Sequence, residues 1–172
     1  HNGQHEEHLY PSDRFPFTYG ETTDPFTRRS DSILARNTAK FLPKVMHTQS
    51  AAEYWHRSGS LVHTDPLGAR DVEIPENVRI YAFGGTQHGP APDPPSRGIA
   101  DNLANPGDFR PIMRALLEAL DAWAKDGTLP PASVYPRLDQ GTLVDWRQRS
   151  TGFPGLPGVR YPEVIQQPHR LD

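Results

Sequence analysis

The stretch PENVRIYAFGGTQHGP, residues 75–90, decides the fold. Its centre, Val78–Phe83, consists mainly of β-branched, aromatic and small apolar residues, with turn-forming residues before it and two glycines after it. These features predict a β-strand over residues 78–83. The loop that follows carries His88. A histidine on a loop beyond a strand is a candidate general base, so this stretch bears on function as well as on fold.

Three segments around this strand complete an alternating pattern. The sequence predicts a strand over Lys44–Thr48, a helix over Ala51–Leu61 and a second helix over Asp108–Lys125, where apolar residues recur at helical spacing. A shorter helix is expected over Asp31–Phe41. The order strand, helix, strand, helix is typical of parallel strands joined by helical crossovers. Because two strands cannot form a parallel sheet buried on both faces, we interpret the chain as the C-terminal portion of an α/β sheet whose other strands lie upstream.

The length and composition suggest how this portion is organised. A chain of 172 residues corresponds to about one domain. We expect a surface loop over residues 1–30, the strand-helix-strand-helix segment over 31–127 and an irregular C-terminal extension over 128–172. The 14 glycines and 19 prolines indicate a loop-rich folded chain. The hydrophobic fraction of 35% is low for an independent core, which suggests that residues outside the chain supply part of it.

Charge and composition exclude several classes of function. The net charge of −3 gives no basic surface for nucleic acid, and no apolar run approaches the roughly 18 residues of a membrane span. The absence of cysteine excludes thiol nucleophiles and cysteine-bound metals. His1, His5 and His8 have a spacing that could bind zinc, but a solvated chain end is the more common role there. We therefore predict no metal and no cofactor, and the sequence indicates no compartment.

Two titratable residues follow the two predicted strands at the same distance. Glu53 lies five residues after Thr48, and His88 lies five residues after Phe83. Carboxyl ends of parallel strands share one edge of a sheet, and neighbouring strands are about 4.8 Å apart. A carboxylate there could orient the imidazole so that its other nitrogen takes a proton from a nucleophile. Asp65 is an alternative acid.

Ordinary structural roles compete with this interpretation at each position. A glutamate in a first helical turn is favoured by the helix dipole without any function. A loop histidine can be satisfied by backbone groups alone. Asp65 precedes a proline, where an aspartate usually serves a turn.

No serine of the chain provides the expected nucleophile. The serine-hydrolase nucleophile lies in a Gly-x-Ser-x-Gly turn between a strand and a helix, and the nearest stretch here, RSGSL at residues 57–61, lacks the flanking glycines. In that fold the nucleophile precedes the acid and the histidine along the chain. With the acid at Glu53 and the histidine at His88, the serine is expected before residue 1, and the chain alone is expected to be inactive.

Several multi-residue motifs carry a resemblance to a known family. They are EYW (53–55), GSLVHTD (59–65), PENVRIY (75–81) and GTQHG (85–89), with YPSDRFPFTYGETTDP (10–25) upstream and DFRPIMRALLEALDAW (108–123) and DGTLPPASVYPRL (126–138) downstream. The chain resembles the C-terminal part of α/β-hydrolase-domain proteins, a mostly bacterial family of largely unassigned substrate. The resemblance implies His88 as the base and Glu53 as the acid of a catalytic triad. It also implies that the half of the domain that bears the nucleophile is absent from this chain.

Two hypotheses of function follow. The first is that the chain is the acid and histidine half of a serine-dependent carboxylic ester hydrolase, which acts on a small-molecule ester or a related acyl bond. Its partner would be the N-terminal half of the same domain. The alternative is a non-catalytic, loop-rich binding module that uses the proline-rich segment 90–106 and the aromatic N-terminal loop as its surface. A Gly-x-Ser-x-Gly turn before residue 1 would favour the enzyme.

Overall fold

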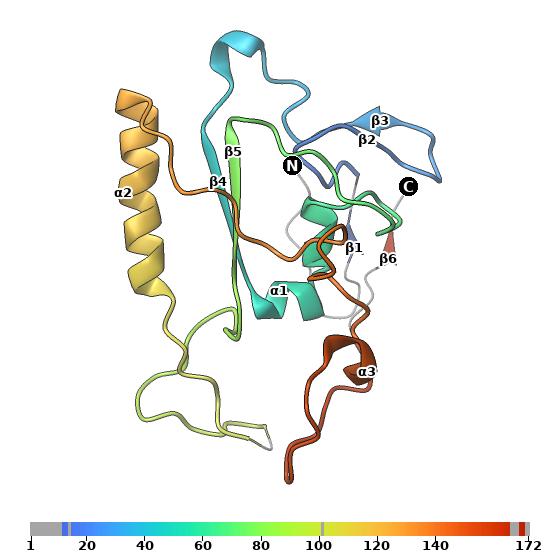
Figure 1. Ribbon diagram of the computed structural model, residues 1–172, viewed down its shortest axis with the longest axis vertical. Coiled ribbons are helices and arrows are strands. Elements are labelled where there is room, and N and C mark those ends of the chain that lie inside the picture. Colours follow the sequence, from blue (N-terminus) through green and yellow to red (C-terminus); the bar gives the residue numbers. More distant parts are fainter. Residues whose placement is uncertain (1–11, 14, 101, 166–168, 171–172) are drawn as a thin grey trace. The chain divides into compact units, whose positions relative to one another are not determined.

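The computed structural model describes residues 12–13, 15–100, 102–165 and 169–170 (Figure 1). His1, His5 and His8 lie outside the described residues. The chain forms two compact units. One unit comprises residues 34–54 and 74–135 and holds both longer strands and the longest helix; the other comprises residues 1–33, 55–73 and 136–172.

The two longer strands pair in parallel, as expected. β4 (Val45–Ser50) and β5 (Val78–Phe83) are in register from Val45 opposite Val78 to Ser50 opposite Phe83. β5 has the predicted bounds, and its Val78 and Ile80 are fully buried. β4 continues two residues beyond the predicted strand end, so that Gln49 and Ser50 belong to the strand and not to a loop.

A segment near residue 134 covers the second edge of β5. The Ala82 amide donates to the Val134 carbonyl at 2.8 Å, and the Val134 amide donates to the Ile80 carbonyl at 2.9 Å. The Ser133 hydroxyl accepts the Ile80 amide at 3.0 Å. In the part of the chain that the structure describes, β4 pairs with β5 alone, so no described strand pairs with the other edge of β4.

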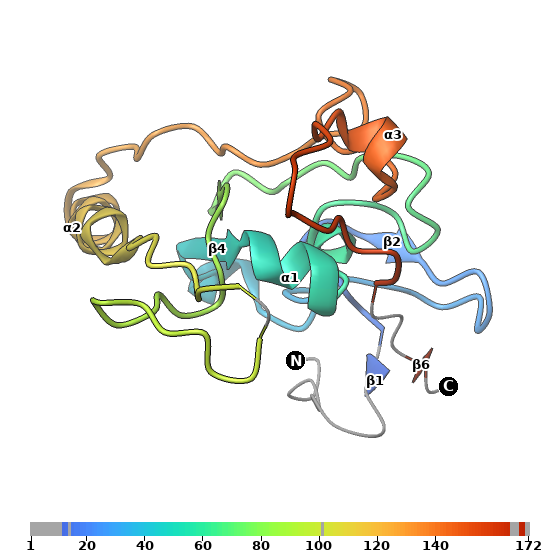
Figure 2. The ribbon, with the colours of Figure 1, turned by 90° about the horizontal axis from the view of Figure 1, so that it is seen from below.

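The longest helix, α2 (Arg110–Asp126), closely matches the predicted one, and Figure 2 shows it end-on. Trp123 on α2 is 1% exposed and lies between two cations, the Lys44 Nζ at 4.7 Å and the Arg79 Cζ at 5.0 Å from its ring centre. The rest of the apolar stripe is only partly buried, and Ile112 and Leu117 are exposed. The helix therefore presents apolar side chains that no described residue covers.

Two predicted helices were wrong in extent. α1 (Ala51–His56) follows β4 directly, but it ends before Ser58, which adopts a left-handed conformation with φ of 51°, and a 3₁₀ helix, η2 (Gly59–Val62), follows. The left-handed residue interrupts the helical hydrogen bonds that would have continued to Leu61.

In place of a helix over residues 31–41, the chain forms a strand, a turn and a single 3₁₀ turn. β3 (Ser30–Asp31) pairs antiparallel with β2 (Thr22–Thr23), and only η1 (Ala39–Phe41) is helical. The Asp31 carboxylate accepts the amide of Ser32 at 2.9 Å. Local bonds of this kind compete with helix formation.

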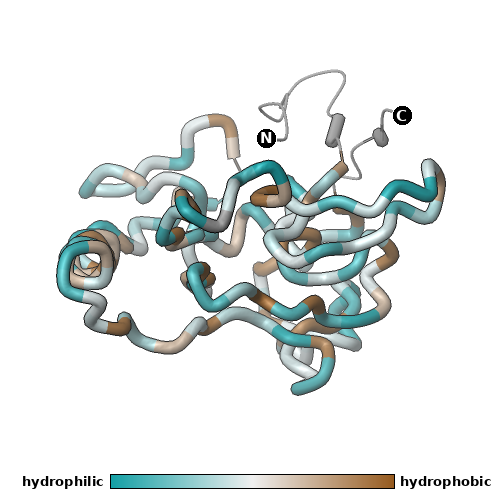
Figure 3. Tube along the Cα trace, turned by 90° about the horizontal axis from the view of Figure 1, so that it is seen from above, coloured by the Kyte–Doolittle hydropathy of each residue, from teal (hydrophilic) through white to brown (hydrophobic). Residues whose placement is uncertain are grey.

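The second unit is built mainly from short elements. β1 (Ser12–Asp13) pairs with β6 (His169–Arg170), and α3 (Gln148–Thr151) interrupts the expected irregular extension. Part of the expected surface loop is buried instead, as at Phe17 and Asp24. Apolar residues occur in short stretches along the trace (Figure 3). None of the described helices is long and apolar enough to cross a membrane.

Candidate active site

The register of the sheet brings the two segments that carry Glu53 and His88 to one edge. Ser50 and Phe83 are the last residues of β4 and β5 and lie opposite each other. α1 begins at the next residue, Ala51, so Glu53 stands in its first turn, three residues beyond the strand. Gly85, with φ of 67°, turns the chain after β5 into the loop that carries His88. Both side chains therefore start from the carboxyl edge of the β4–β5 pair.

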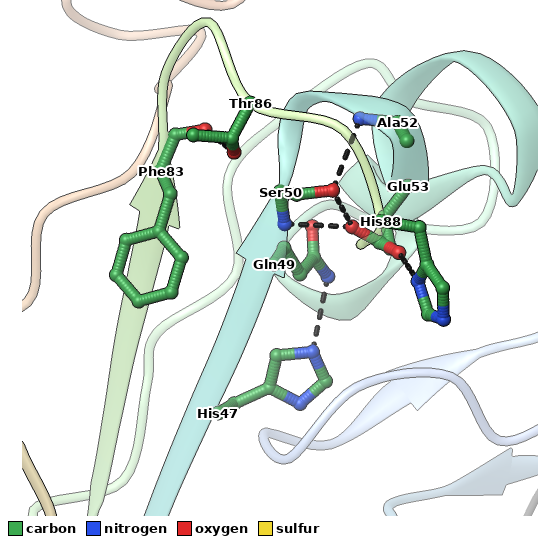
Figure 4. A network of polar contacts seen from close by, with 8 residues as sticks. All are labelled: His47, Gln49, Ser50, Ala52, Glu53, Phe83, Thr86 and His88. Carbon is green, nitrogen blue, oxygen red and sulfur yellow. Dashed lines mark hydrogen bonds and ion pairs between the residues drawn. The ribbon is translucent and has the colours of Figure 1, made fainter. Parts of the chain in front are cut away.

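The acid and the histidine are in direct contact (Figure 4). The Nδ1 of His88 lies 2.5 Å from the Oε1 of Glu53. Because an ionised carboxylate can only accept, Nδ1 carries the proton and donates it. Within the described residues, Nε2 of His88 makes no hydrogen bond. The imidazole thus holds the tautomer in which Nε2 can take up a proton.

The two side chains differ in their exposure. The side chain of His88 is 74% exposed, whereas that of Glu53 is 18% exposed. The carboxylate is therefore held inside the unit while the imidazole faces outward. This arrangement suits an acid that orients and a base that reacts.

Ser50 holds the second oxygen of the carboxylate. The Oε2 of Glu53 accepts the Ser50 amide at 2.6 Å and the Ser50 hydroxyl at 2.5 Å. Ser50-Ala51-Ala52-Glu53 matches the Ser-x-x-Glu capping box, in which the glutamate reaches back to the amide of the capping residue. Sequence analysis missed Ser50, although this spacing is a readable signal. One carboxylate therefore caps the helix with one oxygen and binds the imidazole with the other.

The surroundings of Glu53 favour its ionised form. Burial by itself raises the pKa of the carboxyl. The hydrogen bonds from the Ser50 hydroxyl, from His88 and from the Ser50 amide, together with the electrostatic interaction with His88, outweigh burial and hold the pKa of Glu53 below its ordinary value. Glu53 is therefore a carboxylate at neutral pH.

A second histidine lies behind the acid on β4. The Nε2 of His47 lies 3.1 Å from the Nε2 of Gln49, which is buried (Figure 4). Burial lowers the pKa of His47, and the Glu53 carboxylate opposes that effect only in part. His47 therefore stays neutral near pH 7 and adds no charge to the site.

Asn105 holds the base of the histidine loop. Its side-chain amide donates to the Gly85 carbonyl at 2.6 Å, and its side-chain oxygen accepts the Gly107 amide at 2.8 Å. Its backbone carbonyl accepts the Ala91 amide at 3.0 Å. The bond to Gly85 ties the proline-rich segment to the loop that carries His88. Nothing in the local sequence distinguishes this asparagine, so sequence analysis missed it.

Asp65, the alternative acid, has local structural contacts. The Asp65 carboxylate accepts the Ala69 amide at 2.7 Å and lies 3.6 Å from the Arg70 guanidinium. The Asp65 carboxylate thus stabilises the turn in which it stands. This is the structural role that was weighed above against a role as the alternative acid. His63 is fully buried. The described residues contain no cluster of three or more histidine, aspartate or glutamate side chains that could hold a metal ion.

A comparison with protein families finds one match. A model described as an alpha/beta hydrolase domain matches residues 9–167. The chain belongs to the alpha/beta hydrolase domain family. No curated protein and no solved structure matches it significantly. Family membership makes hydrolysis the expected chemistry of this domain, while the substrate and the catalytic residues have to be argued from the site.

Proposed function

We propose that this hydrolase domain contributes the acid and the histidine of a serine hydrolase that cleaves an ester or a related acyl bond. The observation that carries the proposal is the 2.5 Å contact between Glu53 and His88 at the carboxyl edge of parallel strands. Active sites of open α/β sheets lie at that edge.

The proposed roles follow from the geometry. Glu53 keeps the proton of His88 on Nδ1, so Nε2 can accept the proton of a serine hydroxyl as that oxygen attacks the acyl carbon. The imidazolium then returns this proton to the departing alcohol, which leaves an acyl-serine. In the second half, His88 takes a proton from water as the water attacks the acyl-serine, and it returns a proton to the serine.

The serine is proposed to come from a segment that precedes this chain in the full-length protein. No serine of residues 1–172 has the Gly-x-Ser-x-Gly pattern. Ser50 is not a substitute, because its hydroxyl is bonded to the carboxylate and not to the imidazole. No described strand pairs with the second edge of β4, and this edge and the exposed apolar side chains of α2 suit the other half of such a domain.

The proposal is tested by replacing His88 in the full-length protein and measuring hydrolysis of p-nitrophenyl acetate and butyrate. We expect His88→Ala to lower kcat/KM by roughly 10²–10⁴-fold, the usual contribution of a positioned acid-base group. His56→Ala is the matched control, because His56 is an exposed histidine at the end of α1. Equal activity of the two variants would favour a non-catalytic binding role.

A further inference from the structure

The hydroxyl of Ser50 makes a bond that helix capping does not require. In an ordinary capping box the serine hydroxyl accepts the backbone amide of the glutamate. Here it accepts the amide of Ala52 at 3.3 Å and lies 2.5 Å from the Oε2 of Glu53. Because the carboxylate cannot donate, the hydroxyl proton must point to Oε2.

We propose that Ser50 is a positioning residue of the reaction, which fixes the Glu53 carboxylate so that its other oxygen faces His88. This inference rests on the proposed function. Among the described residues, the carboxylate of Glu53 is bonded only to Ser50, through Oε2, and to His88, through Oε1. If the Ser50 contacts were lost, its one remaining partner would be an imidazole whose side chain is 74% exposed. Ser50 is itself 5% exposed, so water does not readily replace its hydroxyl. A donor fixed in advance stabilises charge without reorganisation during the reaction.

The consequence for pH dependence has a definite sign. The Ser50 hydroxyl is the largest of the contributions that lower the pKa of Glu53. Removing it raises that pKa, so the carboxylate is lost at a higher pH. Activity that needs the ionised acid should then begin to fall at a higher pH on the acid side.

The test compares Ser50→Ala, Ser50→Thr and Asp108→Ala in the full-length protein. Ser50→Ala should lower kcat/KM about tenfold at neutral pH, with a larger loss in acid, and Ser50→Thr should restore most of the activity because it keeps the hydroxyl. Asp108 lies just before α2, where its carboxylate accepts the amide of Arg110, the first residue of that helix, at 2.9 Å. Asp108→Ala therefore controls for the loss of a side-chain hydrogen bond to a backbone amide at the start of a helix, and it should leave the pH profile unchanged.

A second measurement judges Ser50 independently of activity. The ¹³C resonance of the Glu53 carboxyl should titrate at higher pH in Ser50→Ala than in the parent or in Asp108→Ala. An unchanged Glu53 titration, or an equal shift in the Asp108→Ala control, would overturn the positioning role. If His88→Ala kept full activity, the proposed function would fail, whereas this titration would still decide what Ser50 does to the carboxylate.

Discussion

Replacing Glu53 by glutamine, its nearest isostere, tests the orientation of the imidazole most severely. The carboxylate uses both oxygens as acceptors, one for the two Ser50 donors and one for His88. An amide has a single oxygen. If that oxygen stays with Ser50, the amide nitrogen faces Nδ1 and the proton of His88 must move to Nε2, which is the wrong tautomer for a base. If it faces His88, the amide nitrogen meets the Ser50 amide, and two donors oppose each other.

The first orientation keeps two bonds at Ser50, so we expect it to prevail in Glu53→Gln. Replacing the acid of a serine protease triad by its amide costs about 10⁴-fold in kcat through this change of tautomer. The side chain of His88 is 74% exposed, which allows water to restore the productive tautomer in part. We therefore expect kcat to fall by roughly 10³-fold with little change in KM.

The assay is steady-state hydrolysis of p-nitrophenyl butyrate by the full-length protein, combined with ¹⁵N NMR of the His88 ring. Glu118→Gln, on the exposed surface of α2, is the matched control and should behave like the parent. The reasoning is refuted if Glu53→Gln loses less than about threefold in kcat, a change too small for a lost orienting acid. It is equally refuted if His88 keeps its proton on Nδ1 in that variant.

The remaining predictions concern stability, the isolated chain and the histidine loop. The lowered pKa of Glu53 stabilises the fold at pH values above the ordinary glutamate pKa of about 4.3, and this stabilisation is lost as the pH falls through the lowered pKa. The melting temperature should therefore fall less steeply with decreasing pH in Glu53→Gln than in the parent. Equal slopes in the two proteins would argue against a lowered pKa of Glu53. Residues 1–172 alone should hydrolyse no aryl ester above the level of His88→Ala, which parallel rate measurements can check. The same chain should aggregate or melt without cooperativity, because no described strand pairs with the second edge of β4 and apolar α2 side chains are exposed, whereas a sharp monomeric transition in calorimetry would contradict this. Asn105→Ala should lower kcat/KM several-fold and speed hydrogen exchange around Gly85, and unchanged exchange would remove its role in the loop.

Local chemistry explains why part of the site was predictable from sequence. β5 is dense in β-branched and aromatic residues and is bounded by turn residues, so its limits were read correctly. The contact of Glu53 with His88 followed from one general property, that parallel strands end at a common edge. The predicted distance of Glu53 from the end of its strand was less accurate. β4 continues two residues further than predicted, so Glu53 stands in a helical turn and not in a loop.

The parts that were missed depend on contacts between distant residues. The backbone hydrogen bonds between Val134 and β5 join positions about fifty residues apart, and no local sequence pattern predicts such pairing. Asn105 is similar, because its role comes from where the chain returns beside Gly85. The helix expected over residues 31–41 failed because β3 pairs with β2, a tertiary preference that overrode local propensity. Ser50 differs from these, since its capping spacing was visible in the sequence.

The most direct test of the central claim is to map the residue of the full-length protein that a fluorophosphonate modifies. This reagent labels only a serine that a working base activates. The account predicts a single adduct, on a serine before residue 1 of this chain, in the parent and in His56→Ala, and almost none in His88→Ala. An adduct on a serine within residues 1–172 would contradict the upstream position of the nucleophile. Undiminished labelling of His88→Ala would contradict the assignment of His88 as the base.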